Sequence, residues 1–348
     1  MEYCFFILSY KRAKFCHDNT FRLINSFRHS GKIFIVCSDD DSTIDEYIEI
    51  FGNQNVLIFN KERIQNIYDI DVMDCFNYEK KIGILWARNA VYEFARNLGY
   101  EHFIVLDDDY DSLHLKMIKY KGNKTILKEI RNIFNIMDFD TVASLMFDLL
   151  DSQPFISVVA FAQNGDFIGG SENRFVLEGY KFKAMNWFFH STKKITRYIG
   201  RINEDVNRYL YNNNTGRLSL SISDISLHQF MTQNADNGMT DIYKKMGTYI
   251  KSFYSVMMNP SCCSIALIGN TYNKFNVFET MRIHHQIKFK YNVPKILNEK
   301  YSKTDKNNQK IEYYDIMKVK RFKLSDIDIV KLSNIKNISS NDDIEELF

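Results

Sequence analysis

The chain has 348 residues, of which 45% are hydrophobic and 25% are charged, and its formal net charge is +2. These values exclude a disordered polypeptide and leave room for one large α/β domain or two small ones. A net charge this close to zero says little about a polyanionic partner, since a local basic groove remains compatible with it. No apolar run is long enough to span a bilayer or to form a signal peptide, so we expect a cytoplasmic protein.

The cysteines show no CxxC spacing and no regular framework. Two of them lie inside apolar runs that are typical of buried strands. We therefore expect reduced, buried thiols and no zinc site. The six are Cys4, Cys16, Cys37, Cys75, Cys262 and Cys263.

The first third of the chain alternates between β-rich apolar runs and segments with helical spacing. Such alternation predicts a sheet that is mainly parallel in the N-terminal half, with helices on both faces. No GxGxxG or Walker sequence follows any of the strands, so the usual dinucleotide and P-loop fingerprints are missing. We predict strands at 4–9, 32–38, 55–59 and 102–106, and helices at 19–28, 42–50 with Ser42 as cap, and 83–98.

After residue 111 the alternation breaks down, and shorter elements are expected. The segment 243–254 mixes lysines with aromatic residues, which suits phosphate contact or base stacking; a strand with one wet face explains it almost as well. Lys251 is the residue of this segment that we expect to contact a phosphate. Residues 300–310 are polar and predict a linker or exposed loop. We predict a hairpin at 115–127, helices at 141–150, 204–211 and 324–332, and strands at 156–162, 218–222, 226–230, 263–269 and 283–289.

The predicted strand at 102–106 ends in three consecutive acids, Asp107, Asp108 and Asp109. Adjacent carboxylates repel one another, so they are commonly kept where a cation binds. Carboxylate oxygens suit Mg²⁺ or Mn²⁺, which bind through one or two acids plus substrate phosphates. Open α/β sheets bind ligands at the carboxyl ends of their strands. The triplet therefore indicates a metal–diphosphate site, and the alternative is an acidic turn that faces water.

Other polar residues follow the predicted strands at the same sheet edge. Arg88 and Asn89 open the helix before the triplet, where Arg88 either contacts a phosphate or pairs with an acid such as Glu93. Asp39 follows the second strand and either holds a base or ribose or belongs to a helix-start acid cluster. A nucleotide is also expected beside the end of the first strand, at Ser9, Tyr10, Lys11 and Arg12.

Two later motifs carry candidate chemistry. Glu204 and Asp205 begin a helix, where acids are favoured electrostatically, and either could serve as a general base. His284 and His285 are adjacent on a predicted strand, so their rings should face opposite ways and at most one should reach a metal site. An isolated histidine is more often structural than a ligand.

In this order, the motifs resemble a GT-A glycosyltransferase, and across residues 200–300 they resemble the TET-associated glycosyltransferase family. The motifs are ILSYKR, ARN, DDD, NEDVNRYL, MTDIYKKMGTYIKSFYSVMMNPS, RIHHQI and VPKILNEKY. The family is found largely in phages and related elements. The resemblance covers about residues 1–301.

The resemblance implies a GT-A-like mixed α/β fold and sugar transfer from a nucleotide donor, expected to be UDP-glucose or another UDP-sugar. The implied acceptor is a hydroxymethylated pyrimidine in DNA, and the implied cofactor is Mn²⁺ or Mg²⁺. By position, Asp107 and Asp109 match the metal-binding Asp-x-Asp, with Asp108 as a third candidate. Asp205 matches the catalytic base, with Glu204 beside it, and His284 or His285 the late metal ligand.

The motifs leave two rival readings and a simple division of the chain. One rival is a nucleic-acid-binding protein that kept the fold without catalysis, and the other is a metal-dependent nucleotidyltransferase. We expect a glycosyltransferase domain at 1–300, with a donor half at 1–110 and an acceptor half at 111–300. Residues 301–348 would form a C-terminal extension.

Overall fold

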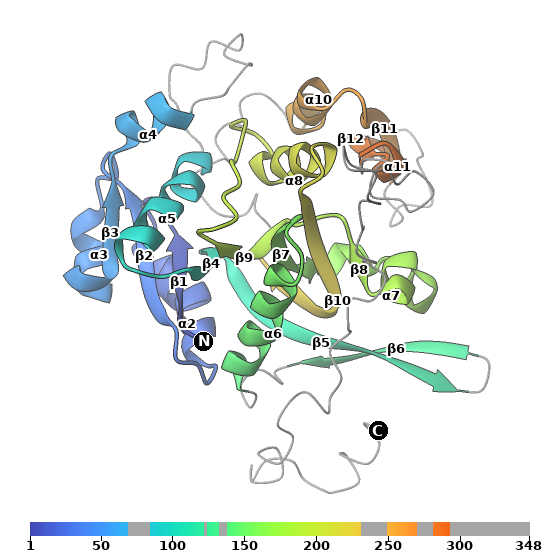
Figure 1. Ribbon diagram of the computed structural model, residues 1–348, viewed down its shortest axis with the longest axis horizontal. Coiled ribbons are helices and arrows are strands. Elements are labelled where there is room, and N and C mark those ends of the chain that lie inside the picture. Colours follow the sequence, from blue (N-terminus) through green and yellow to red (C-terminus); the bar gives the residue numbers. More distant parts are fainter. Residues whose placement is uncertain (69–83, 122–123, 132–137, 231–248, 270–280, 293–348) are drawn as a thin grey trace, which may run out of the picture.

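A mixed β-sheet forms the centre of the protein in the computed structural model, which describes residues 1–68, 84–121, 124–131, 138–230, 249–269 and 281–292 (Figure 1). The strand order is β3-β2-β1-β4-β9-β7-β10-β5-β6, and β8 pairs with β10. The strands are β1 (Tyr3–Leu8), β2 (Lys32–Ser38), β3 (Val56–Phe59), β4 (His102–Asp107), β5 (Tyr110–Lys121), β6 (Lys124–Arg131), β7 (Ile156–Gln163), β8 (Tyr180–Lys181), β9 (Asn186–Ser191) and β10 (Leu218–Gln229).

The N-terminal half of the sheet is parallel, as the sequence predicts. β1 pairs in parallel with both β2 and β4, and β2 with β3, while β9 runs antiparallel to β4 and β7. Parallel pairing places the carboxyl ends of β1, β2 and β4 at one edge, where the polar motifs follow them. The expected mixed α/β fold is confirmed.

Helices cover both faces of the sheet because β1 alternates its side chains between two cores. Phe5 and Ile7 pack with α2, α3 and α6, whereas Phe6 and Leu8 pack with α4 and α5. The helices are α1 (Ala13–Cys16), α2 (Arg22–Asn25), α3 (Ile44–Phe51), α4 (Lys61–Tyr68), α5 (Leu85–Asn97), α6 (Phe139–Asp151), α7 (Arg174–Glu178), α8 (Glu204–Asn214), α10 (Tyr249–Met258) and α11 (Phe289–Asn292). A π-helical turn, η1 (His17–Phe21), joins α1 to α2.

A second, two-stranded sheet of β11 (Cys263–Gly269) and β12 (Met281–Ile287) lies beside α10 and α11, at the end of the molecule where α8 lies (Figure 1). The β5–β6 hairpin projects from the edge of the main sheet that is opposite β3, at the lower right of Figure 1. Within the described residues, no helix combines the length and the apolar character needed to cross a membrane.

Several local predictions need correction. Strands predicted at 218–222 and 226–230 form the single strand β10, whose register with β7 shifts between Ile222 and Ser226, so an irregular polar stretch looked like a break. Of the lysine–aromatic segment, residues 243–248 lie outside the described residues, and the rest begins α10, where Ile250 and Tyr254 are buried at helical spacing. The alternative of a strand with one wet face is therefore wrong for residues 249–254. Helix α3 has Thr43, and not Ser42, at its N-cap. The predicted helix at 19–28 begins earlier, at Ala13.

Other predictions are confirmed or lie outside the described residues. The second strand and the hairpin form as expected, and Gly52 ends α3 with a positive φ of 82°. Five cysteines are free and buried, and Cys75 lies outside the described residues. The predicted linker at 300–310 and helix at 324–332 also lie outside them.

Candidate active site

Each acid of the triplet has a different environment, although all three follow β4. Asp107 accepts two hydrogen bonds from one terminal nitrogen of Arg88, 2.9 Å from each carboxylate oxygen. Asp108 is fully buried and pairs with Arg12, with nitrogen–oxygen distances of 2.6 and 2.7 Å. Asp109 has no such partner, and its buried Oδ1 lacks a hydrogen-bond partner among the described residues. Among the described residues, Asp109 is therefore the one acid of the triplet that does not pair directly with an arginine.

The electrostatics of Asp109 follow from this arrangement. Burial, together with the neighbouring charges of Asp107 and Asp108, raises the pKa of Asp109 to about 7. Arg12 opposes this rise only in part. A buried carboxylate with a raised pKa and an unsatisfied oxygen suits a divalent cation, because a cation would supply the missing charge and the missing contact.

The turn after β1 holds Asp108 in place. Ser9 Oγ donates to Asp108 Oδ2 at 2.6 Å and lies 2.7 Å from the hydroxyl oxygen of Tyr47 on α3. Lys11 has a positive φ of 57°, and its backbone N–H donates to Asp41 Oδ2 at 2.7 Å. The predicted donor residues Ser9 and Arg12 thus make contact with the triplet, because β1 and β4 are parallel neighbours.

Arg88 links the triplet to α8. Its terminal nitrogen binds Asp107, and its Nε lies 3.3 Å from Glu204 Oε1. Its side chain is 4% exposed, and its guanidinium lies 4.9 Å from the centroid of the Phe188 ring. Glu93, the alternative partner that the sequence suggested, pairs instead with Arg63. Arg88 therefore brings together two motifs that lie almost a hundred residues apart in the sequence.

The two acids that begin α8 differ in exposure and in their partners. Burial raises the pKa of Glu204 to about 7, against the opposing charge of Arg88. Asp205 is partly exposed, and its Oδ1 accepts a hydrogen bond from the N–H of Val206 at 2.7 Å. The residue before them, Asn203, has a positive φ of 54°, and its side chain donates to Lys251 O and Ser255 Oγ on α10. These bonds fix where α8 begins.

Two residues that were predicted to contact the nucleotide-sugar donor form hydrogen bonds to other parts of the protein. Asn89 is buried, and its amide exchanges two 3.0 Å hydrogen bonds with the backbone of Tyr198. Asp39 accepts from Asn60 Nδ2 and from the N–H of Lys61, at the start of α4. Tyr10 is half-buried in the turn after β1, where the Lys11 ammonium lies 5.1 Å from its ring. Whether these residues contact a donor stays a prediction.

The histidine pair lies on β12, beside α10. The two ring centroids are 4.5 Å apart, so the prediction that the rings face opposite ways is wrong. His284 Nδ1 lies 2.6 Å from the carbonyl oxygen of His285, so the ring of His284 lies against the backbone of the next residue. Burial and the nearby charges of His284, Lys251 and Lys183 lower the pKa of His285 to about 4. A metal-ligand role for either histidine stays a prediction.

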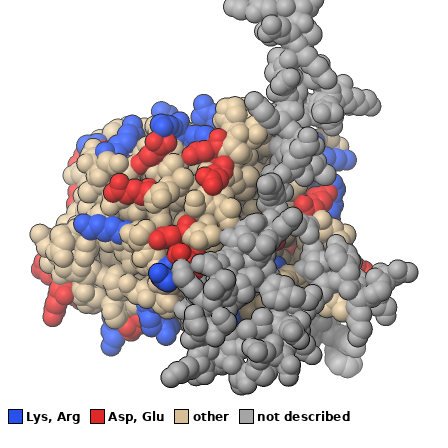
Figure 2. Space-filling model, turned by 60° about the horizontal axis from the view of Figure 1, so that its bottom comes forward, with Lys and Arg blue, Asp and Glu red and all other residues tan. Residues whose placement is uncertain are grey.

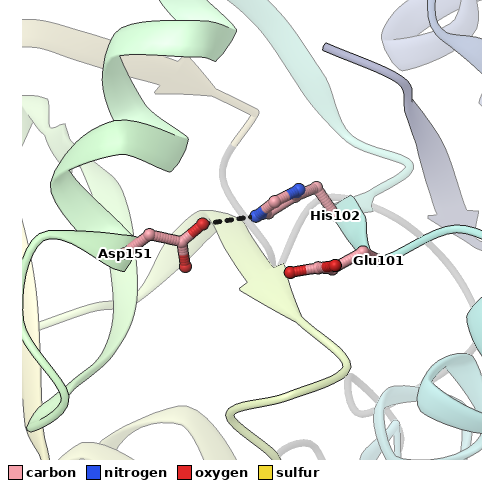
Figure 3. Close-up of side chains that lie close together, drawn as sticks. All are labelled: Glu101, His102 and Asp151. Atoms are coloured by element: carbon pink, nitrogen blue, oxygen red, sulfur yellow. Dashed lines mark hydrogen bonds and ion pairs between the residues drawn. The ribbon is translucent and has the colours of Figure 1, made fainter.

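One potential metal cluster lies elsewhere in the fold. Among the residues that the structure describes, the only set of three acid, histidine or cysteine ligand atoms within 4.8 Å of one another belongs to Glu101, His102 and Asp151 (Figure 3). His102 Nε2 lies 2.7 Å from Asp151 Oδ2, and Lys193 Nζ lies 2.7 Å from Glu101. This set lies at the amino end of β4, about 17 Å along the strand from the triplet at ~3.3 Å per residue. It therefore cannot complete the predicted donor site.

The sequence matches a known protein family. The model of the family described as TET-Associated Glycosyltransferase matches residues 3–238, more than half of the chain. The chain belongs to the TET-associated glycosyltransferase family. Membership makes it a glycosyltransferase and implies a nucleotide-sugar donor, as the sequence motifs predict. Comparison with curated protein sequences found no match.

Among solved structures, the matches include nucleotide-sugar enzymes. Glucosyl-3-phosphoglycerate synthase from Mycobacterium tuberculosis, in complex with Mn²⁺ and UDP-glucose, is 8% identical with a TM-score of 0.38, covering 83% of this chain and 90% of that one. S. aureus TarS in complex with UDP-GlcNAc is 14% identical with a TM-score of 0.34, covering 71% and 64%. A putative nucleotide-diphospho-sugar transferase from Desulfovibrio desulfuricans is 8% identical with a TM-score of 0.33, covering 70% and 94%.

Proposed function

We propose that this glycosyltransferase moves a sugar from a UDP-sugar to the hydroxyl of a 5-hydroxymethylpyrimidine in DNA, with inversion and with Mn²⁺ or Mg²⁺ as cofactor. The observation that carries the proposal is the buried, arginine-free carboxylate of Asp109 at the carboxyl end of β4, with Arg88 joining the adjacent acid to α8. This pairing supports the proposal because it would put the cation and the candidate base at one sheet edge.

The residues of the triplet divide the work. Asp109 would hold the divalent cation, with Asp107 beside it, since Oδ1 of Asp109 is buried without a hydrogen-bond partner among the described residues. When bound, the cation neutralises charge on the departing diphosphate as a Lewis acid. Asp108 keeps the turn after β1 in place through Ser9 and Arg12, which leaves that turn ready to receive the nucleotide.

Asp205 is the better candidate for the general base. Glu204 is buried against Arg88, so removing a proton from an incoming hydroxyl would compete with that ion pair. Asp205 is partly exposed and uses Oδ1 to accept from Val206, which leaves Oδ2 for the acceptor hydroxyl. Deprotonation by a carboxylate in hydrogen-bond reach prepares the hydroxyl for in-line attack on the anomeric carbon. Glu204 acts by holding Arg88 and the start of α8.

The acceptor base would have to leave a duplex to reach this edge. Bases that are modified by enzymes are commonly flipped out or taken from single strands. Trp187 and Phe188 do not serve as a stacking surface, because both are buried in the two cores that flank β9.

Product analysis tests the proposal. The protein is incubated with UDP-glucose, UDP-GlcNAc or a UDP-pentose, Mn²⁺, and DNA with or without 5-hydroxymethylcytosine or 5-hydroxymethyluracil. We expect UDP release and a nucleoside heavier by one sugar, only with hydroxymethylated DNA. Release of pyrophosphate would indicate the rival nucleotidyltransferase, and no turnover with any donor would favour a binding protein without catalysis.

A further inference from the structure

A cavity of about 800 Å³ opens between α2 and the β5–β6 hairpin. Its walls come from α2, β5, β6, β10 and the short turn at 164–167. This volume is within the range of pockets that bind small molecules. The basic and aromatic side chains in the lining include Arg22, Phe27, His114, Lys116, Arg131 and Phe167.

The charge of the cavity centres on one acid that serves three basic groups. Glu129 Oε1 lies 2.9 Å from His114 Nδ1 and 3.0 Å from Arg131 Nε, and Glu129 Oε2 contacts Lys116 Nζ. Lys116 is buried, with only 6% of its side chain exposed. Asp111 is a second carboxylate in the lining, so three permanent cations, Arg22, Lys116 and Arg131, face two acids, and the cavity keeps a net positive charge. Arg22 lines the cavity from α2. Such a lining favours an anion.

Ring side chains lie next to these cations, and His228 is the exposed one that could stack on a base, whereas Phe27, His114 and Phe167 are buried. The rings of His114 and His228 stack with centroids 5.9 Å apart, and His228 Nδ1 lies 3.3 Å from Asp111 Oδ2. Lys116 Nζ lies 4.9 Å from the centroid of the Phe167 ring. Cations beside aromatic and imidazole rings are the combination that proteins use to bind a single-stranded nucleic acid, with phosphates on the cations and bases on the rings.

The cavity adjoins the acidic triplet through two chain segments. Asp111 lines it and lies two residues after Asp109. His228 also lines it, and the backbone N–H of Phe230, two residues later, donates to the carbonyl oxygen of Asp109 at 3.1 Å. A polymer that occupies the cavity would therefore lie beside the edge where we place sugar transfer.

We propose that this cavity binds a nucleotide of the acceptor strand, next to the one that receives the sugar; the inference rests on the function proposed above. On the face drawn in Figure 2, acidic and basic side chains are intermingled, so the coloured part shows no broad basic surface for a duplex. Contact at a recessed basic and aromatic site suits a single strand or a locally opened duplex.

The test measures affinity for a fluorescent single-stranded oligodeoxynucleotide that contains 5-hydroxymethylcytosine, by anisotropy at several salt concentrations. The test variant is Arg22→Gln/Arg131→Gln, since both positions have exposed surface and the changes should not unfold the protein. Lys128→Met is the matched control: it is on β6 between the lining residues Leu127 and Glu129, and strand alternation turns it to the other face. Binding of UDP with Mn²⁺, measured by calorimetry, reports separately on the donor site.

We expect the double variant to bind the oligonucleotide at least tenfold more weakly, with the slope of log K against log salt reduced by about 1.4. Lys128→Met and UDP binding should be unchanged. Wild-type affinity in the double variant, an equal loss in Lys128→Met, or tighter binding of a free mononucleotide than of the strand would overturn the inference while leaving the donor site intact. Failure of the wild type to bind UDP would instead count against the proposed function.

Discussion

Arg88 holds Asp107 with one terminal nitrogen, at 2.9 Å from each carboxylate oxygen, and both side chains lie at the carboxyl edge of the sheet. The same guanidinium lies 3.3 Å from Glu204 through Nε. This relationship joins the end of β4 to the start of α8. Within the part of the chain that the structure describes, Asp109 is then the acid of the triplet without an arginine partner.

The first prediction concerns Arg88. Arg88→Met should lower the free energy of unfolding by about 3–5 kcal/mol, because it leaves the carboxylates of Asp107 and Glu204 near each other and uncompensated. Urea unfolding measures this. Arg63→Met is the control, since its pair with Glu93 is exposed and should contribute at most about 1 kcal/mol. A loss in Arg88→Met as small as in the control would contradict the linking role of Arg88.

The second prediction concerns the cation. Asp109→Asn should abolish the dependence of donor turnover on Mn²⁺ and lower kcat by at least about 100-fold, because the ligand charge is lost. Turnover at a series of Mn²⁺ concentrations, and after chelation, measures this. The control is Asp148→Asn, which changes an exposed acid on α6 that belongs to neither proposed site. Activity close to that of the wild type in Asp109→Asn would remove the triplet from the mechanism.

The third prediction is a pH dependence of stability without metal. The pKa of Asp109 is about 7 in the fold and about 3.9 in the unfolded chain, so between these values the native state binds more protons. Stability should therefore fall as pH rises from about 5 to 7. Asp109→Asn should lose less over this range and should exceed the wild type at pH 8 by roughly 1–3 kcal/mol.

Thermal and urea unfolding at pH 5, 6, 7 and 8 in chelator check this. Glu204 also has a pKa of about 7 and contributes in the same direction, so the variant keeps part of the slope. A wild-type stability that rises between pH 5 and 7, or an identical profile in the variant, would show that Asp109 titrates normally.

The fourth prediction separates the two acids of α8. Asp205→Asn should lower kcat by roughly 10²–10⁴-fold with little change in the KM for the donor, as expected on loss of a general base. Glu204→Gln should instead leave kcat close to that of the wild type, because Glu204 faces Arg88 and is not the proposed base. Initial rates and unfolding of both variants decide between them. A large kcat loss in Glu204→Gln alone would move the base to Glu204.

The fifth prediction concerns how α8 is placed. Asn203→Ala should cost about 1–3 kcal/mol, because its side chain binds Lys251 O and Ser255 Oγ and its φ of 54° disfavours alanine. Asn203→Gly relieves the backbone strain and loses only the bonds, so it should be less destabilising. Unfolding curves for both variants separate these contributions. Equal losses would mean that the backbone conformation is unimportant.

The sequence by itself determined the alternation of strands and helices in the N-terminal half, the acids at the end of β4, and the family. These features depend on local periodicity and on short ordered motifs, and neither requires knowledge of tertiary contacts. Local periodicity predicts the elements less accurately where a strand changes its register with its neighbour. The pattern of β10 predicts two strands because the register shift after Ile222 interrupts it. The residues that begin α10 leave a nucleic-acid-contacting segment and a strand with one wet face as alternatives, because their apolar stripe is short.

Only the tertiary structure decided which acids of the triplet pair with an arginine. Asp107, Asp108 and Asp109 are equivalent in the sequence, and the choice depends on Arg88 from α5 and Arg12 from the turn after β1. Likewise, Asn89 has the sequence position of a donor contact, yet its amide is bonded to Tyr198. Pairing between distant segments is set by the order of the strands in the sheet and by burial, and neither is encoded in local spacing.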